Sequence, residues 1–379
     1  MTSDCEVAFK RIPISSSRRA AVYPLSVASV IARCLFAKKS NRNTFVVIEP
    51  YGMGDIISLR PMLEVLAQYS QGCNVLIKPI WEDLLPSHPN LQMRPAILPW
   101  TSYSGGQKYG VKSLLQGPVG HLIQEIRREA PGSVGIDPRG DIRNILFLYL
   151  AGCRQVITLD HYLGTTAKIP FWVAKTVTSA PGARRWQTTE GLLRAAGITH
   201  NSRLSPPFFH SCLPHSSPIR QIRCITTAPW PGRLWPTGRW LELKMRLSSA
   251  GYLVSGICGP GQANETALAL GGAPVFEAPT VASWIDAFRS TDLLITLDTG
   301  PMHLADAMGL PLLALFGPGQ QPMWAPSGLY SKTVHHQDAP DFYPCHQVDE
   351  NIELGEKWMN RITVDEVYSS FEKLIRALS

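Results

Sequence analysis

The stretch 293–317 constrains the fold more than any other part of this sequence. Leu293–Leu297 is a short apolar run, which is typical of a strand buried on both faces of a sheet. Pro301 suits the first position of a helix, and Gly309 suits the position just after its end. Leu312–Phe316 is a second apolar run. The pattern therefore predicts a strand, a helix and a parallel strand, which is the repeating unit of an α/β fold.

The turn after the first of these strands has the residues of a ligand site. Asp298 and Thr299 follow the carboxyl end of the strand, where open parallel sheets bind their ligands. The N-terminus of the next helix offers free N–H groups that suit a phosphate. Asp298 could accept hydrogen bonds from sugar hydroxyls, and Thr299 and His303 could contact the same ligand. A capped helix with a solvated Asp298 and a packed His303 explains the same residues without a ligand.

The chain of 379 residues is long enough for two domains. Predicted strands and helices alternate on both sides of a segment rich in Pro, Ser and His at 201–220, which we interpret as a linker. The predicted fold class is α/β, with two doubly wound, Rossmann-like domains that face a cleft. The predicted parts are an N-terminal appendage (1–44), a first domain (45–205), a second domain (221–360) and a C-terminal helix (361–379) that could pack back on the first domain.

Composition limits the classes of partner. A formal net charge of +7 favours acidic partners such as phosphorylated sugars or anionic lipid. Basic runs interleaved with aromatic residues are not evident, so we predict no nucleic-acid partner. The eight cysteines are scattered without a C-x-x-C pair, which suggests neither a zinc site nor a disulfide framework. Reduced thiols and a cytoplasmic location are expected.

The apolar stretch 20–37 is predicted to be an additional helix packed on the protein. Pro24 and Arg33 interrupt it, and no signal-cleavage site is clear. It is also too polar to span a membrane. An amphipathic helix on the inner, anionic face of a membrane is the alternative. That alternative draws support from the basic residues that follow the stretch, which are Lys38, Lys39 and Arg42.

A glycine turn follows the first predicted strand, at 52–55. Its glycines allow a backbone to approach closely, and Asp55 could act as a general base on a substrate hydroxyl. Asp55 could equally serve only as a helix cap. A dinucleotide-binding fingerprint is excluded, because its third glycine would fall at Ile57.

Two turns of the second half also follow predicted strands. Arg233 lies in the turn 228–236, which is rich in Pro and Gly, and could bind a diphosphate through paired hydrogen bonds or stack on a tryptophan. The glycine turn at 258–265 could approach a nucleotide, with Asn264 or Glu265 on its ribose.

Together these motifs resemble the signature of the heptosyltransferases of glycosyltransferase family 9. The matches occur in the family's order over roughly residues 44 to 376, and four ordered matches make chance similarity improbable. They are Gly54-Asp55 before Pro61, IDPRGDIR at 136–143, RLWP at 233–236, and DTGPMHL at 298–304 with Phe316-Gly317-Pro318 after it.

The resemblance implies a GT-B fold whose N-terminal domain binds the acceptor and whose C-terminal domain binds the nucleotide-sugar donor. It implies that Asp55 is the catalytic base and that the acceptor side includes Gly52, Met53, Gly54, Arg60 and Arg139. It implies a donor site made of Thr226, Thr227, Arg233, Glu265, Asp298, Thr299, Gly300, Pro301, Met302 and His303. Five residues depart from the usual pattern of the family: Arg233 replaces a lysine, Glu49 a basic residue, Ser58 a histidine, Arg60 an apolar residue and Asp306 an alanine.

The predicted function is that of an inverting, metal-independent glycosyltransferase without a cofactor. It would move a heptose or a similar sugar, most often from ADP-heptose in this family, to a hydroxyl of a glycan, glycolipid or protein, as in lipopolysaccharide biosynthesis. The predicted location is the cytoplasm, with peripheral contact to the inner membrane face as an option. The alternatives are a non-catalytic nucleotide-sugar-binding protein and a nucleotide-sugar epimerase on a GT-B fold.

Overall fold

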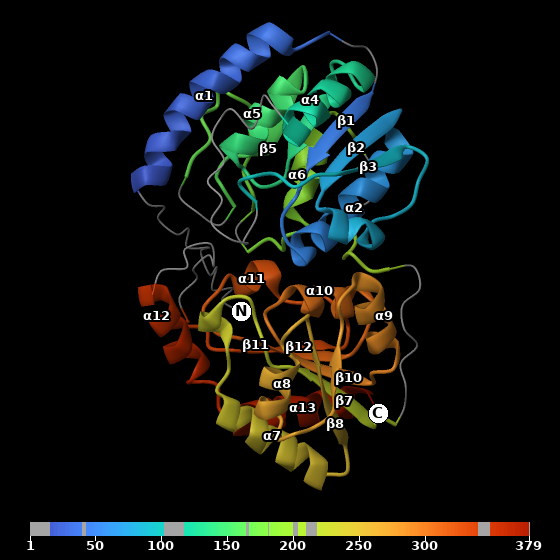
Figure 1. Ribbon diagram of the computed structural model, residues 1–379, viewed down its shortest axis with the longest axis vertical. Helices are drawn as coiled ribbons and strands as arrows, with labels where there is room; N and C mark the ends of the chain where they lie inside the picture. Colours follow the sequence, from blue (N-terminus) through green and yellow to red (C-terminus); the bar gives the residue numbers. More distant parts are fainter. Residues whose placement is uncertain are drawn as a thin grey trace, which may run out of the picture. The chain divides into compact units, whose positions relative to one another are not determined.

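The computed structural model describes residues 16–39, 43–101, 117–163, 167–180, 182–199, 204–209, 218–339 and 349–378. The chain divides into two compact units, residues 1–205 and 206–379, with the division inside the segment that we interpret as a linker. Each unit is a six-stranded parallel sheet flanked by helices (Figure 1). Two doubly wound domains are therefore present, as the sequence predicts.

The sheet of the first unit has the strand order β3-β2-β1-β4-β5-β6. Its strands are β1 (Thr44–Ile48), β2 (Gly72–Ile77), β3 (Leu91–Pro95), β4 (Val134–Asp137), β5 (Gln155–Leu159) and β6 (Lys175–Val177). The accompanying helices are α1 (Ser16–Phe36), α2 (Met53–Tyr69), η1 (Pro79–Leu84), α4 (Gly117–Glu129), α5 (Ile142–Leu150) and α6 (Thr188–Ala195). The order reverses between β1 and β4, and the carboxyl ends of strands at such a switch point are where doubly wound sheets bind ligands.

The second unit repeats this topology, with the order β12-β11-β10-β7-β8-β9. Its strands are β7 (Gln221–Ile225), β8 (Leu253–Cys258), β9 (Val275–Glu277), β10 (Leu293–Leu297), β11 (Leu312–Phe316) and β12 (Ser331–His335). Its helices are η2 (Pro231–Arg233), α7 (Thr237–Ser249), α8 (Ala263–Ala269), α9 (Val281–Arg289), α10 (Gly300–Ala307), α11 (Gln321–Trp324), α12 (Asp349–Met359) and α13 (Val364–Leu378). The switch point lies between β7 and β10, so the turns after these two strands share one edge of the sheet.

The unit β10-α10-β11 forms as the sequence predicts. All residues of β10 and β11 are buried, and the two strands pair in parallel from Leu294 with Leu312 to Leu297 with Leu315. Pro301 stands in the first turn of α10, and Gly309 follows the helix with a φ of 77°, a conformation that favours glycine. The turn at Asp298 and Thr299 is thereby fixed between two strands of the core.

The C-terminal helix α13 packs within the second unit, against α7, β11 and β12. Its apolar face, which includes Val367, Phe371 and Leu374, belongs to the core of that unit. The sequence analysis allowed this helix to pack on the first domain. Its apolar face is buried within the second unit without such packing.

Helix α1 packs along α5 within the first unit, as expected for an additional helix (Figure 1). Small residues, Ser26, Ser29 and Ala32, form the buried side of the contact. Each serine hydroxyl donates to a carbonyl one turn earlier in the same helix, at 2.7 Å, so its burial leaves no unpaired group. Within the described residues, no helix is long and apolar enough to cross a membrane.

Candidate active site

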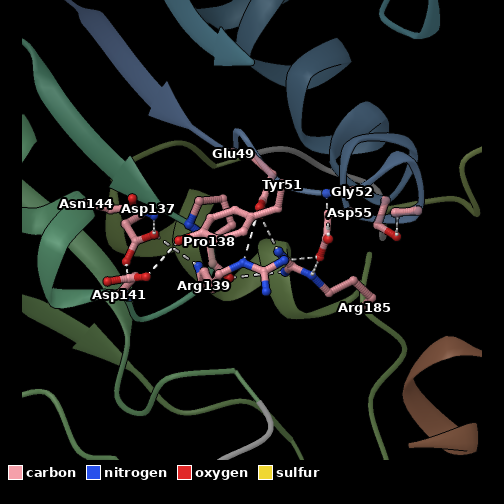
Figure 2. Close-up of polar contacts among 12 residues, drawn as sticks. Glu49, Tyr51, Gly52, Asp55, Asp137, Pro138, Arg139, Asp141, Asn144 and Arg185 are labelled. Carbon is pink, nitrogen blue, oxygen red and sulfur yellow. Dashed lines mark hydrogen bonds and ion pairs between the residues drawn. The ribbon is translucent and has the colours of Figure 1, made fainter. Parts of the chain in front are cut away.

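Asp55 lies at the N-terminus of α2, directly after the central strand β1 (Figure 2). The helix starts at Met53, with Gly52 as its N-cap. The Gly52 N–H donates to Asp55 Oδ2 at 3.1 Å, so the carboxylate pairs a backbone group of the turn. The Asp55 side chain keeps 12% of its surface exposed, enough for one oxygen to meet a ligand.

Two buried guanidinium groups hold the other oxygen of this carboxylate. Arg139 Nη2 lies 2.5 Å from Asp55 Oδ1, and Arg185 Nε lies 3.7 Å from the same atom. The side chains of Arg139 and Arg185 are 3% and 1% exposed. We call these residues, with the buried Glu49, the Asp55 cluster (Figure 2). The ion pairs with Arg139 and Arg185 thus fix the orientation of the Asp55 carboxylate.

Glu49 links the two arginines from within the core. Its Oε1 lies 3.3 Å from Arg139 Nε, and its Oε2 lies 2.7 Å from Arg185 Nη2. Complete burial raises the pKa of Glu49 to about 7; Arg139 and Arg185 oppose this rise, and Asp55 adds to it. Glu49, which stands where the family usually has a basic residue, therefore serves as the counter-ion of both guanidinium groups.

We expect the stability of the first unit to depend on pH through Glu49. A raised pKa in the folded state means that stability from this group is present at low pH and is lost as pH rises through about 7. From pH 5 to pH 8, the wild type should lose about 2–3 kcal/mol of unfolding free energy relative to Glu49→Gln. Thermal unfolding of both proteins at the two pH values measures this change, with Glu82→Gln, an exposed carboxylate of the same unit, as the control. A difference that stays constant with pH would show that the pKa of Glu49 is not raised.

The turn 138–141 connects β4 with α5 and positions Arg139. Asp137 Oδ1 accepts the N–H of Arg139 at 3.2 Å, and Asp137 Oδ2 accepts the N–H of Asp141 at 2.7 Å. Gly140 has a φ of 73°, and a Cβ on it would lie 2.1 Å from the carbonyl oxygen of His161. The hydrogen bonds of Asp137 and the close approach at Gly140 thus fix the backbone at the end of β4.

An aromatic ring completes the support of Arg139. The Arg139 guanidinium lies 3.7 Å from the centroid of the Tyr51 ring, and the Tyr51 hydroxyl donates to Asp141 Oδ2 at 2.7 Å. Asp141 also caps α5 by accepting the N–H of Arg143 at 2.9 Å. The residues that follow β1 and β4 therefore hold one another at the switch point of this sheet.

The sequence analysis missed two cations of this site, Arg185 and Lys78. Arg185 comes from an irregular segment before α6, and only the fold brings it to Glu49. Lys78 follows β2, the neighbour of β1, and partial burial lowers its pKa, with Asp55 opposing this and Arg139 adding to it. The sequence alone could have identified Lys78 as a residue of this site, because the carboxyl ends of neighbouring parallel strands lie at the same edge of a sheet.

The remaining residues predicted on the acceptor side take different positions. Gly52 and Gly54 shape the turn, and Met53 is buried. Arg60 is also buried; its Nε pairs with Glu64 at 3.1 Å and its Nη1 donates to the carbonyl of Leu84 at 3.2 Å. The hydrogen bond to Leu84 ties α2 to η1, and the pair with Glu64 lies within α2. The acceptor-side role of Arg60 stays a prediction.

In the second unit, Arg233 and Asp298 are brought together across the switch point. Arg233 Nη1 donates to the Asp298 carbonyl at 2.9 Å, and Nη2 lies 3.0 Å from Asp298 Oδ2. The Nε of Arg233 and the hydroxyl of Thr226 are buried and have no hydrogen-bond partner within the described part of the chain. We call these three residues, with Thr227, the Arg233 site. Its unpaired polar atoms suit a polar ligand, because such atoms are costly to leave unpaired.

Other predicted donor residues surround this site at the same sheet edge. The Thr227 hydroxyl donates to Gln262 Oε1 at 3.0 Å, and Thr299 is the N-cap of α10, which begins at Gly300. Met302 is fully buried, so its side chain packs in the core, whereas the half-buried His303 ring meets the edge of Trp324. Pro301 is half-buried in the first turn of α10, and Glu265 is exposed in the first turn of α8.

Asp306, where the family usually has alanine, has a structural role. Its two carboxylate oxygens accept hydrogen bonds from Ser327 N at 2.7 Å, Gly328 N at 2.9 Å and the Ser331 hydroxyl at 2.6 Å. These contacts tie α10 to the turn that precedes β12. The substitution thus stabilises the scaffold behind the Arg233 site.

Among the described residues, no group of three or more His, Cys, Asp or Glu side chains could hold a metal ion. The described cysteines are free: Cys34, Cys73, Cys153, Cys224 and Cys258. Cys345 lies outside the described residues.

Comparison with known proteins finds a family whose model matches most of the second unit. The model of glycosyltransferase family 9 (heptosyltransferase) matches residues 216–350, which include the Arg233 site. Lipopolysaccharide heptosyltransferase 1 of Pseudomonas aeruginosa is 28% identical over 120 residues, which are 31% of this chain and 32% of that protein. The match therefore spans about a third of that relative. The resemblance that the motifs indicate is confirmed.

Solved structures extend the similarity to most of the chain. Escherichia coli heptosyltransferase WaaC with ADP has a TM-score of 0.62 at 12% identity, over 87% of this chain and 99% of that one. The iron-containing dodecameric glycosyltransferase TibC of enterotoxigenic E. coli has a TM-score of 0.54 at 15% identity, over 90% of this chain and 78% of that one. At such identities the similarity shows the fold alone. The predicted GT-B class is confirmed.

Proposed function

We propose that this chain, which belongs to glycosyltransferase family 9 by its C-terminal domain, is an enzyme that transfers a heptose or a similar sugar from a nucleotide diphosphate sugar to an acceptor hydroxyl. ADP-heptose is the proposed donor, and a glycan, glycolipid or protein is the proposed acceptor. The relatives support this choice: one is a lipopolysaccharide heptosyltransferase, and another was solved with ADP.

The observation that carries the proposal is the way in which neighbouring residues orient the Asp55 carboxylate. In an inverting transfer, an acceptor oxygen attacks the anomeric carbon while the bond from that carbon to the diphosphate breaks. Asp55 would take the hydroxyl proton as the new bond forms. Its carboxylate is partly exposed, stands at the end of β1 and is held in orientation by Gly52, Arg139 and Arg185. A protein that only binds nucleotide sugars would have no need of this arrangement.

The Arg233 site would receive the departing nucleotide diphosphate. Arg233 carries a guanidinium with an unpaired Nε, and the N-terminus of α10 offers free backbone N–H groups beside it. These groups would stabilise the negative charge that develops on the diphosphate as the sugar leaves. Asp298 would accept hydrogen bonds from hydroxyls of the donor. The proposed transfer therefore uses protein cations for this charge, with no metal required.

The same proposal assigns the acceptor to the first unit and the donor to the second. It places the enzyme in the cytoplasm, with peripheral contact to the inner membrane face. Glycolipid acceptors would be met at that face.

The proposed donor can be tested by thermal unfolding in the presence of nucleotide diphosphate sugars. A ligand that binds only the folded protein at 100 times its Kd stabilises it by about 2.7 kcal/mol. We expect ADP-heptose and ADP to raise the melting temperature more than the UDP or GDP sugars do. A UDP sugar that stabilises most would change the proposed donor, and the absence of any shift at millimolar concentrations would contradict the proposed function.

A further inference from the structure

Helix α1 has an unusual distribution of side chains. The fully buried residues of the face packed on α5 are small, Ser26, Ser29 and Ala32, and Leu25 and Phe36 are partly buried against the same core. Four further large apolar side chains are exposed: Tyr23, Val27, Ile31 and Leu35, at 70%, 39%, 54% and 68%. Their spacing of four residues places them in one stripe along the helix. An ordinary surface helix carries polar side chains on its outer face, so a second, exposed apolar stripe is unusual.

A second exposed apolar element is fixed to the same part of the first unit. Phe171 is 85% exposed and Trp172 is 41% exposed, in a turn whose flanking Ile169 and Val173 are buried. The Tyr149 hydroxyl of α5 donates to the Val173 carbonyl at 2.7 Å. Helix α5 thus anchors this turn as well as α1, and the buried residues of all three belong to one core cluster.

The charge of the surrounding sequence is of one sign. From Val7 to Ile48 there is no Asp or Glu, and there are eight basic residues: Lys10, Arg11, Arg18, Arg19, Arg33, Lys38, Lys39 and Arg42. Of these, Arg33, Lys38 and Lys39 are described and exposed. Exposed large apolar side chains next to basic ones, in a stretch of sequence without acidic residues, are complementary to a layer of anionic lipid.

We propose that the exposed stripe of α1, together with Phe171 and Trp172, docks the first unit on an anionic membrane surface. The helix would lie along the interface, with its apolar stripe among the acyl chains and its Lys and Arg side chains at the headgroups. A second copy of the chain fits this face less well, because its basic residues would oppose one another. The proposal rests on the membrane contact included in the proposed function and names the surface that would make it. Docking needs no sugar transfer, so a failure of membrane binding and a failure of donor binding are separate results.

Co-sedimentation of the full chain with vesicles tests the proposal. We expect binding to vesicles of 30% phosphatidylglycerol in phosphatidylcholine, and at least tenfold weaker binding to pure phosphatidylcholine. The double variant Ile31→Glu/Leu35→Glu should bind the anionic vesicles at least tenfold more weakly. The matched control is Met245→Glu/Leu329→Glu, which places the same charges on exposed apolar residues of the second unit and should bind as the wild type does.

A second variant protects the test against misfolding. Phe171→Ser/Trp172→Ser leaves α1 unchanged and should also weaken binding, while circular dichroism and the midpoint of thermal unfolding verify that each variant is folded. Two outcomes would overturn the proposal: full binding by the Ile31→Glu/Leu35→Glu variant, or no binding of the wild type to anionic vesicles. A concentration-dependent dimer that the same variant abolishes would overturn it too, because this face would then belong to a second copy.

Discussion

Asp55→Asn is expected to lower the rate of sugar transfer by roughly 10²- to 10⁴-fold, the usual contribution of a general base. Asparagine has the shape of aspartate, yet its amide cannot take the proton of the acceptor hydroxyl. Glu49 would still pair with Arg139 and Arg185, so the two buried guanidinium groups keep a partner. Because Asp55 belongs to the first unit and the Arg233 site to the second, the affinity for the donor should stay the same.

Initial rates with the donor and a hydroxyl acceptor, together with donor affinity by calorimetry, measure these two effects. Asp83→Asn is the matched control, since it removes the same charge from an exposed position of the same unit and should leave the rate unchanged. Asp55→Glu retains a carboxylate but moves it by one methylene, so its rate should fall between those of the wild type and Asp55→Asn. Normal turnover by Asp55→Asn would show that another group is the base.

The sequence predicts the central strands of both sheets and misses most of the edge strands. Strands such as β1 and β10 are continuous apolar runs, because they are buried on both faces. The unpredicted strands β3, β6 and β12 are all edges of their sheets, and most of their residues are exposed or half-buried. Their polar sequences carry no signal of burial, and only pairing with a neighbour makes them strands.

The motifs identify the residues at the candidate site, but they do not identify the buried residues that support them. Asp55, Arg139, Arg233 and Asp298 all follow central strands, and the repeated strand order brings each pair to a switch point. Arg185 carries no such signal. It is 136 positions from Glu49 in sequence, and their contact depends on how the segment before α6 crosses the end of the sheet. Buried counter-ions of this kind are set by tertiary structure, which local patterns do not encode.

Arg233→Ala is expected to weaken donor binding by roughly 10- to 150-fold, which corresponds to the 1.5–3 kcal/mol of a hydrogen bond to a charged group. The substitution removes the guanidinium proposed for the diphosphate. It also leaves the nearly buried Asp298 carboxylate without its cation, which places an uncompensated negative charge near an anionic ligand. Arg233→Lys, which restores the residue usual in the family, should recover much of the affinity as a point charge, although it loses the paired geometry of the guanidinium.

Calorimetric titration with ADP measures this loss, because ADP carries the diphosphate without the sugar. Arg246→Ala is the matched control: it removes the same charge from an exposed position on α7, where Arg246 pairs with Asp365. A comparable loss in that control would mean that net charge, rather than a direct contact, governs binding. Unchanged affinity in Arg233→Ala would remove Arg233 from the diphosphate site and leave the N-terminus of α10 as the group that binds it. A loss for ADP in Arg233→Ala, with none for adenosine, would locate the contact at the diphosphate itself.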